Sequence, residues 1–434
     1  MPGSKLGSLY SIMTFGESHG PFIGVVIDGL KPGLPIDLEE IQRELDRRRP
    51  GQSKVTTPRN EADRAQIVSG IFEGKTTGTP ICIIIPNQDQ RSKDYGKLKE
   101  IFRPGHAAFT YLKKYGIFDY RGGGRASGRE TATRVAAGAI AKQLLRREGI
   151  EFYGFVRRIG PHEAQTVDYH FIEQNPVRCC DPAVAQTMEH YITGLAEAGD
   201  SAGGIVELHI RGLPAGLGDP VFEKLDAELS HGLMSIGAVK GIEFGNGFRA
   251  AEMLGSENND RFHRDPVSGQ VLPETNHAGG ILGGISTGQD LVLRIAVKPP
   301  SSINKVQHTV DRSGAPVALS VGGRHDPCIC PRVVPVAEAM AALVILDLLL
   351  VQQVIADGEK NAAALALEIE QIDAQVLMLL QRRELLAARQ SAKPGMPEQS
   401  PAQQLDRIRD LAEQTGFDPA KVSKIWDVIL ESIK

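Results

Sequence analysis

The chain has 434 residues, of which 41% are hydrophobic and 24% are charged, and its formal net charge at pH 7 is -4. These values are typical of an ordered globular protein large enough for more than one domain, and they exclude an intrinsically disordered chain. A slightly acidic chain is also a poor general binder of nucleic acids or anionic membranes, so we expect basic residues only in local groups that bind one acidic ligand.

Apolar periodicity predicts both strands and helices in the first 355 residues. Short apolar runs predict strands at 22–27, 81–85, 205–210 and 291–297. Longer runs with helical spacing predict helices at 38–48, 131–147, 221–233 and 336–355. The two kinds of element do not alternate steadily, so we expect an α+β layered fold rather than a doubly wound parallel sheet.

Glycine usage changes abruptly near residue 358. The chain holds 47 glycines, but beyond Gly358 only Gly395 and Gly416 occur. Functional sites are often built from glycine-rich loops, so we expect such a site in a first domain at 1–357. The glycine-poor remainder, 358–434, is expected to be a helical second domain.

The cysteine content and the N-terminus predict a cytoplasmic enzyme. The five cysteines lack the number and spacing of a disulfide framework or a zinc site, so we expect reduced thiols and no metal. The N-terminus lacks a basic segment followed by an apolar one, so no signal peptide is predicted. The most apolar run, 341–351, is short and contains Asp347, which indicates a core helix rather than a membrane span.

Arginines gather on glycine-bearing loops in the first half of the chain. A guanidinium binds phosphate or carboxylate through two parallel hydrogen bonds, so such a group suits an acidic ligand. The arginines are Arg47, Arg48, Arg49, Arg59, Arg103, Arg121, Arg125 and Arg129. The run 120–131 adds three consecutive glycines before a helix, where a backbone can approach a ligand closely, but it is neither a Walker loop nor a Rossmann fingerprint.

Two loop histidines and one aspartate are candidate acids or bases. His19 lies in the run Gly-Glu-Ser-His-Gly before a strand, and His106 follows Arg-Pro-Gly. An imidazole beside arginines can exchange a proton with a leaving phosphate or a flavin, although many loop histidines are only polar surface residues. Asp326, in the run Gly-Arg-His-Asp-Pro ahead of a helix, would be either a helix cap or a general base.

Eight sequence blocks over residues 5–355 resemble the chorismate synthase family. They read FGESHG at 15–20, DRRRPGQSK at 46–54, RPGHA at 103–107, RGGGRASGRET at 121–131, GSENND at 255–260, NHAGGILGGIS at 276–286, KPPSSI at 298–303 and GRHDPC at 323–328. The resemblance implies a 1,4-anti-elimination of phosphate and a proton from 5-enolpyruvylshikimate 3-phosphate, with reduced FMN as cofactor. It also implies a sandwich of helices between antiparallel sheets, assembled as a homotetramer.

The same resemblance assigns roles to individual residues. His19 would protonate the departing phosphate, His106 would assist the flavin, and Asp326 would help the flavin accept the substrate proton. Substrate anions would be bound by Arg48, Arg49, Arg103, Arg129 and Arg324. Flavin contacts would come from Arg125, Ala126, Ser127, Ala238, Gly283, Lys298, Pro299, Pro300, Ser301, Ser302 and Arg324. NADPH, as a reductant of the flavin, would contact Arg48 and Lys54.

A few positions depart from the family's pattern. Lys54 stands where arginine is common, Ala108 replaces an aspartate, and Pro300 replaces a threonine. The glycine loop reads RASGRET rather than RSSARET. Because none of these changes removes a proposed acid or base, we expect the activity to be retained.

The second domain is predicted to hold helices at 362–393, 401–414 and from Asp418 onward. An apolar stripe on the first of them predicts an oligomerisation or regulatory tail. The runs at 372–386 and 406–413 also resemble the all-helical chorismate mutase family, whose reaction would consume chorismate. That resemblance implies a mutase site with Arg383, Lys393 and Arg407, yet Ala366 and Ile408 stand where an arginine and a glutamate are expected. Both hypotheses therefore stay open.

Two other function classes are less consistent with these residues. A dehydrogenase that uses NAD(P) is disfavoured because the Rossmann fingerprint is absent. A non-catalytic phosphate-binding protein would use the arginines, but it would not need two histidines and Asp326.

Overall fold

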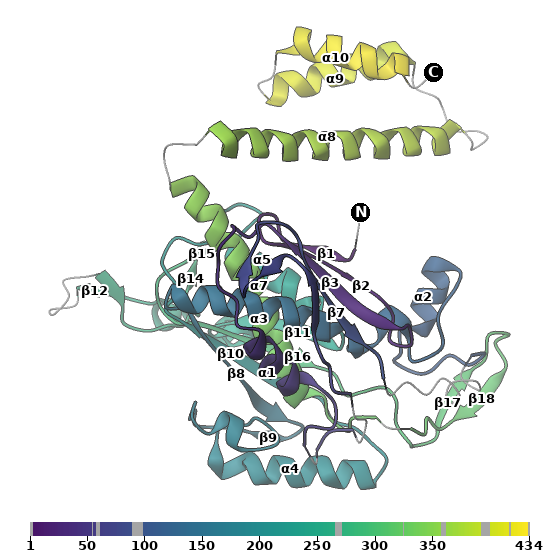
Figure 1. The fold of residues 1–434 in the computed structure, drawn as a ribbon, viewed down its shortest axis with the longest axis vertical. Helices are drawn as coiled ribbons and strands as arrows, with labels where there is room; N and C mark the ends of the chain where they lie inside the picture. Colours follow the sequence, from purple (N-terminus) through teal and green to yellow (C-terminus); the bar gives the residue numbers. More distant parts are fainter. Residues whose placement is uncertain are drawn as a thin grey trace. The chain divides into compact units, whose positions relative to one another are not determined.

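The structure, a computed structural model, describes residues 3–53, 55–57, 61–88, 99–264, 271–323, 325–356, 362–391, 400–415 and 418–432. The chain divides into two compact units, Met1–Gln353 and Val354–Lys434. Each unit has its own arrangement of elements, which Figure 1 follows along the chain.

The first unit contains a five-stranded antiparallel sheet built from the N-terminal region. Its strands lie in the order β1 (Lys5–Leu6), β2 (Ser11–Phe15), β3 (Phe22–Asp28), β7 (Ile81–Pro86) and β4 (Gln66–Ser69). Side chains alternate along β7, so that Ile81, Ile83 and Ile85 are fully buried while the residues between them are partly exposed. This alternation fixes which face of the sheet packs against the core.

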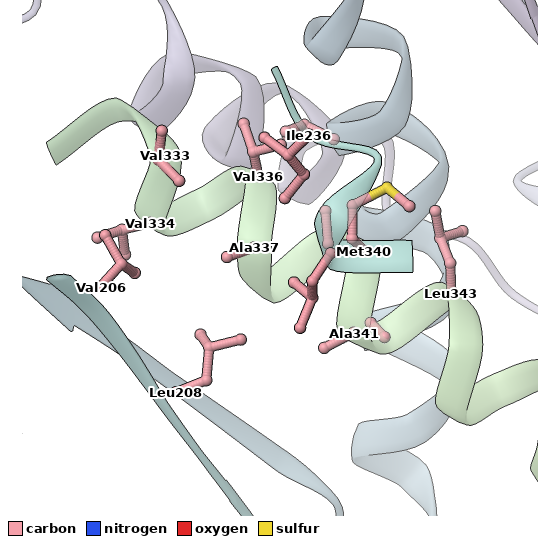
Figure 2. Packing of buried hydrophobic residues seen from close by; sticks show 14 of the residues in the cluster. Val206, Leu208, Ile236, Val333, Val334, Val336, Ala337, Met340, Ala341 and Leu343 are labelled. Carbon is pink, nitrogen blue, oxygen red and sulfur yellow. The ribbon is translucent and has the colours of Figure 1, made fainter. Parts of the chain in front are cut away.

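A second five-stranded antiparallel sheet faces the same core. Its order is β11 (Val239–Phe244), β16 (Leu291–Val297), β10 (Gly204–Arg211), β8 (Glu151–Ile159) and β9 (His162–Glu163). Val206 and Leu208 of β10 are completely buried and pack toward the long helix α7 (Cys330–Ala356), as Figure 2 shows. Val334 and Ala337 of α7 lie on the facing side of the helix.

Helices α1 (Leu38–Arg48), α3 (Thr131–Arg147) and α7 form the layer that packs with the sheets. Helix α3 contacts β3 and β7 of the first sheet and β8 of the second. Gly138 lets α3 approach α7, because a Cβ there would lie 2.4 Å from the Cβ of Ala339. Helix α7 is long and apolar enough to cross a membrane, but 83% of its most apolar window is buried inside the structure, which is the burial of a core helix.

Shorter elements surround these layers. The four small hairpins are β5 (Ile71–Phe72) with β6 (Lys75–Thr76), β12 (Phe262–Arg264) with β13 (Val271–Pro273), β14 (Ile281–Leu282) with β15 (Ile285–Ser286), and β17 (Gln307–Val310) with β18 (Pro316–Leu319). The shorter α-helices are α2 (Ala108–Tyr115), α4 (Pro182–Glu197), α5 (Leu225–Met234) and α6 (Gly255–Asn258). Two 3-10 turns, η2 (Gly124–Ala126) and η3 (Gly128–Glu130), lead from the glycine-rich loop into α3.

The expected α+β class with antiparallel sheets is confirmed, and two predicted helix starts are wrong. Helix α5 begins at Leu225 rather than at residue 221, because Val221 and Phe222 lie in an exposed loop instead of packing on a helix face. Helix α7 begins at Cys330 rather than at residue 336, with Pro335 inside it. Burial of every side chain from Val333 to Leu346 outweighs the local disruption that proline causes.

The described part of the second unit consists of three helices. They are α8 (Ala362–Ser391), α9 (Pro401–Thr415) and α10 (Pro419–Ser432), and α9 packs against α10. The Asp418 carboxylate caps α10 by accepting hydrogen bonds from the backbone N–H groups of Ala420 and Lys421 at 2.9 and 3.4 Å. Much of the apolar stripe on α8 is exposed, including Ile369, Ile372, Val376 and Leu379.

Candidate active site

Two histidine loops meet at the three consecutive glycines of the first unit. A Cβ added to Gly122 would lie 2.0 Å from Cε1 of His19, and one added to Gly123 would lie 3.6 Å from Nε2 of His106. Both glycines have positive φ angles, +64° and +89°, so the loop turns in a way that other residues rarely adopt. The structure therefore brings the two predicted histidines to adjacent positions of one loop, although they lie 87 residues apart in the sequence (106 − 19).

His106 lies among hydrogen-bond donors and positive charges. Nη2 of Arg103 lies 2.6 Å from its Nε2, and the backbone N–H of Ala108 donates to its Nδ1 at 3.1 Å. Burial, followed by the charges of Arg103, Lys298 and His325, lowers the pKa of His106 to about 3. The ring is therefore neutral at physiological pH.

The segment 298–302 runs along the His106 loop. Nζ of Lys298 donates to the carbonyl of Gly105 at 2.6 Å, and a Cβ on Gly105 would lie 3.3 Å from Cβ of Ser301. Arg103 reaches the Ser302 hydroxyl at 3.5 Å. A primary ammonium and two hydroxyls thus lie beside His106, which is a donor set suited to a phosphate group.

Backbone contacts hold the same segment in place. The N–H of Lys298 donates to the carbonyl of Ala238 at 2.9 Å, and the Ser201 hydroxyl donates to the carbonyl of Pro300 at 2.8 Å. Ala238 itself has a φ of 76°, an uncommon conformation for a residue with a side chain. Pro299 lies against Gly203, where a Cβ would come within 3.0 Å of its ring.

A buried carboxylate joins two of the predicted substrate-binding arginines. Arg48 donates to Oδ2 of Asp63 at 2.8 Å, and Arg129 donates to Oδ1 of the same residue. Burial raises the pKa of Asp63, but the charges of Arg48 and Arg129 outweigh it and the net pKa is lowered. Burial, reinforced by Arg332 and Arg129, lowers the pKa of Arg48 to about 10, against the attraction of Asp63.

Asp326 is tied to the same arginine group. Its Oδ1 accepts from the backbone N–H of Thr57 at 2.9 Å, and its Oδ2 accepts from Nη1 of Arg332 at 2.5 Å. Arg332 also donates through Nε to the carbonyl of Arg48 at 3.1 Å. Asp326 is not a helix cap, because α7 begins only at Cys330 and both carboxylate oxygens have other partners. The cap interpretation is therefore wrong.

The rest of the glycine-rich loop is anchored to the first sheet. Arg125 donates to the hydroxyl of Thr14 in β2 at 2.6 Å and to the carbonyl of Gly16 at 3.4 Å. Ala126 ends the turn η2, and the Ser127 hydroxyl caps η3 by accepting from the N–H of Arg129 at 3.3 Å. The loop thus positions Arg129 at the start of α3.

Other predicted residues lie apart from this group or outside the described residues. Arg49, which follows the last residue of α1, pairs with Asp46 of that helix at 3.6 Å, with 37% of its side chain exposed. Gly283 is at the turn of the hairpin β14–β15, where a Cβ would meet nothing within 4 Å. Lys54, Arg324 and Lys393 lie outside the described residues. Within the described ranges, no three His, Cys, Asp or Glu side chains gather as a metal site.

The arginines predicted in the second unit have different environments. Arg383 of α8 donates to Oε1 of Gln404 at 2.8 Å and lies over the ring of Trp426, 5.8 Å from its centroid. Arg407 of α9 is exposed. The structure therefore ties one of the two described arginines to α9 and α10 and leaves the other at the surface.

Sequence reasoning missed two residues that organise the site, Asp63 and Arg332. Arg332 carried no signal, because the sequence predicts the helix only from residue 336, four residues beyond Arg332. Asp63 carried no signal either, because only the folded chain brings it between arginines 15 and 66 residues away.

Comparisons with known proteins agree on one family. A family model described as chorismate synthase matches residues 10–350. A chorismate synthase from Methanosarcina mazei is 55% identical over 354 residues, which cover 80% of this chain and 96% of the relative. One from Syntrophobacter fumaroxidans is 54% identical and covers 81% and 98%.

The same family emerges from solved structures. One described as a crystal structure of chorismate synthase matches with a TM-score of 0.64 and 31% identity, over 80% of this chain and 93% of that one. The family model ends at residue 350, so it leaves the second unit unmatched.

Proposed function

This chain belongs to the chorismate synthase family, and on that premise we propose that its site binds 5-enolpyruvylshikimate 3-phosphate and eliminates phosphate to give chorismate. The observation that carries this proposal is the approach of His19 and His106 to one glycine loop beside a group of cationic side chains. That arrangement suits a reaction in which a phosphate leaves and a proton is removed from a substrate with several negative charges.

The cationic side chains bind and orient the substrate. Arg48 and Arg129 form a fixed pair on Asp63, and Arg103 lies beside His106. Guanidinium groups that are already oriented stabilise charge on a leaving phosphate without reorganising during the reaction. Arg49 and Arg324 complete the proposed set of substrate-binding arginines.

Proton handling is divided among His19, His106 and Asp326. His19 donates the proton that the departing phosphate accepts. The hydroxyl oxygen of Ser18 lies 3.2 Å from Nδ1 of His19. His106 is neutral in the free enzyme, because burial and the charges of Arg103 and Lys298 lower its pKa to about 3, and it would assist the flavin. Asp326, whose carboxylate is held by Arg332, would help the flavin accept the substrate proton.

Membership of the family implies a reduced flavin, and the donors on the His106 loop fit one. We assign FMN, with its phosphate bound by Lys298, Ser301 and Ser302. Because Gly122 and Gly123 carry no Cβ, the backbone of this loop lies directly against the His19 and His106 rings. When bound, the reduced flavin supplies electron density to the substrate as phosphate leaves. NADPH would reduce it from a position near Arg48 and Lys54.

The test compares anaerobic turnover of the substrate with substrate binding in a His106 variant. His106→Ala should lose most of the turnover with reduced FMN while the substrate, titrated against flavin absorbance, still binds. Retained binding without turnover excludes a non-catalytic phosphate-binding protein. Wild-type turnover in the variant would contradict the role of His106.

For the second unit we propose self-association ahead of mutase chemistry. The observation in favour is the exposed apolar surface of α8, where Leu377, Leu379 and Leu385 are each more than 60% exposed. Such surface is costly in water and is normally covered by a partner. A second copy of the chain fits this need, and the whole enzyme would assemble as a homotetramer.

Mutase activity is the second candidate for this unit. Arg383 is held by Gln404 and Trp426, which would orient it toward an anionic substrate, but Arg407 is exposed. Incubating the protein with chorismate and no flavin distinguishes the two. Prephenate formed above the uncatalysed rate, and lost in Arg383→Ala, would support the mutase. Truncation after residue 357 that changes the oligomer without changing synthase turnover would support self-association.

We place the enzyme in the cytoplasm, with a small-molecule substrate and neither nucleic acid nor membrane as partner. The slightly acidic chain and the buried position of α7 support this placement.

A further inference from the structure

Asp63 is enclosed by the two arginines that it joins. Its side chain is 0% exposed, and its two oxygens accept from different guanidinium groups, Oδ2 from Arg48 and Oδ1 from Arg129. A carboxylate that shares its oxygens in this way fixes both partners at once, because rotating either guanidinium breaks a buried charge-assisted hydrogen bond.

The backbone of Asp63 is held on the same helix that carries Arg48. Gln42 of α1 donates through Nε2 to the carbonyls of Ala62 and Asp63 at 3.4 Å, and its Oε1 accepts from the N–H of Ala65 at 3.3 Å. Asp63 has a φ of 46°, so it occupies a conformation that is unfavourable for a side-chain-bearing residue. The surrounding contacts therefore hold it in a defined place.

The two arginines come from different elements and need a common partner. Arg48 ends α1, whereas Arg129 lies in η3 before α3. Each has further acceptors: the carbonyl of Gly128 lies 2.7 Å from Arg48, and Oδ1 of Asn87 lies 2.8 Å from Arg129. Two buried guanidinium groups repel each other, and this repulsion would separate them if no carboxylate lay between them.

We propose that Asp63 is a positioning residue for the elimination reaction: it holds Arg48 and Arg129 as a preformed pair that receives an anionic group of the substrate, without touching the substrate itself. This inference rests on the proposed function. It follows that Asp63 acts on substrate binding through the two arginines and does not act on the flavin.

The direction in which KM changes in Asp63→Asn distinguishes a positioning role from a simple balance of charge. If Asp63 only offset positive charge, neutralising it would make the site more cationic and would lower the KM for the anionic substrate. If Asp63 positions the arginines, Asp63→Asn turns an amide N–H toward one guanidinium. The hydrogen bond to that guanidinium is lost, the two arginines are no longer held together, and KM rises. We expect a rise of about tenfold or more in KM, a smaller fall in kcat, and unchanged FMN binding.

A double-mutant cycle with Arg129→Ala tests whether the effect travels through the arginine. If Asp63 acts through Arg129, the two substitutions are not independent. The loss of kcat/KM in the double variant is then about tenfold smaller than the product of the losses in the two single variants. Asp181→Asn is the matched control, because Asp181 is a buried carboxylate that accepts from the backbone N–H groups of Gln165, Thr166 and Ala183 away from these arginines. It should leave KM unchanged.

Three results would overturn the inference. They are a lower KM in Asp63→Asn, a loss of kcat/KM in the double variant equal to the product of the two single losses, and the same KM change in Asp181→Asn. If Asp63→Asn does not fold, Gln42→Leu decides the matter, since it loosens the Asp63 backbone and keeps the carboxylate. A raised KM in Gln42→Leu supports positioning, and an unchanged KM contradicts it. Absence of turnover in the wild-type chain would instead contradict the proposed function.

Discussion

Nη2 of Arg103 lies 2.6 Å from Nε2 of His106, so a permanent cation presents a donor directly to an imidazole that is otherwise able to ionise. The backbone N–H of Ala108 offers a second donor to the same ring. A neutral imidazole has one acceptor nitrogen and an imidazolium has none, so the donor from Ala108 to Nδ1 favours the neutral ring, and the charge of Arg103 beside Nε2 opposes a second positive charge. This agrees with the direction of the pKa shift of His106, which burial and the charge of Arg103 lower.

The first prediction follows from that pair. In the free protein, the NMR signals of His106 should show a neutral ring down to about pH 3, since its pKa is lowered to about 3. In Arg103→Met the pKa should rise, because a neighbouring positive charge is removed. Titration of histidine-labelled protein with and without the substitution checks this. An Arg103→Met ring that still titrates with the wild-type pKa would show that burial alone sets the protonation state.

A second prediction concerns the glycine that faces His19. Gly122→Ala should reduce turnover by about tenfold or more, because its Cβ would lie 2.0 Å from the ring and displace the imidazole. Gly33→Ala is the control, since Gly33 also has a positive φ, +82°, but a Cβ there would meet nothing within 4 Å. Both variants carry the backbone strain of about 1–2 kcal/mol, and only the first should lose activity. Equal turnover in the two variants would argue against a required His19 position.

Acid stability should depend on Glu338. This buried carboxylate accepts from Arg47 and Lys142 at 2.7 Å and from the N–H of Gly154 at 3.0 Å. Burial raises the pKa of Glu338, but Arg47 and Lys142 lower it far below its ordinary 4.5. Its stabilising contribution is therefore complete above pH 4.5 and is lost as the pH falls toward the folded-state pKa.

Denaturant titrations at several pH values check this contribution. Glu338→Gln should cost about 2–3 kcal/mol of unfolding free energy near neutral pH and should weaken the acid dependence, because it removes the buried carboxylate that Arg47 and Lys142 share and leaves them with Glu44 as their common charged partner. Glu163→Gln is the control, since Glu163 is 44% exposed and makes only long ion pairs of 3.7 and 4.0 Å. It should cost less than about 1 kcal/mol. Comparable costs would show that the buried network adds little.

A further prediction addresses the flavin donors. Lys298→Met should weaken FMN binding by about tenfold or more, since it removes a charged donor and the contact that holds Gly105. Lys305→Met, which breaks a largely exposed pair with Asp200, should not change FMN affinity. Fluorescence titration of FMN measures both. Unchanged affinity in Lys298→Met would place the flavin phosphate elsewhere.

The sequence predicted those elements in which local pattern and burial agree. Helices at 38–48 and 131–147 begin and end as predicted, since an Asp37 cap marks the first and a glycine-rich turn leads into the second. The start of α7 was not predictable from Pro335, because the burial that overrides proline arises only when both sheets are present. Local signals fail wherever tertiary packing decides the outcome.

The same limit applies to the site. His19, His106 and Lys298 stood in recognisable motifs. In the structure His19 and His106 lie against neighbouring glycines of one loop, and Lys298 donates to the carbonyl of Gly105, next to His106. Asp63 was not recognisable, because its significance comes from two arginines that converge on it only in the folded chain. Motifs identify candidate ligand-binding groups better than the buried groups that contact them.

The most direct test of the central claim is anaerobic incubation of the full chain with 5-enolpyruvylshikimate 3-phosphate and reduced FMN, in which chorismate and phosphate are measured together. We predict that the two products form in equal amounts with the wild-type chain, and that His106→Ala forms far less of both while still binding substrate and FMN. No chorismate from the wild-type chain, or undiminished formation by His106→Ala, would contradict the account.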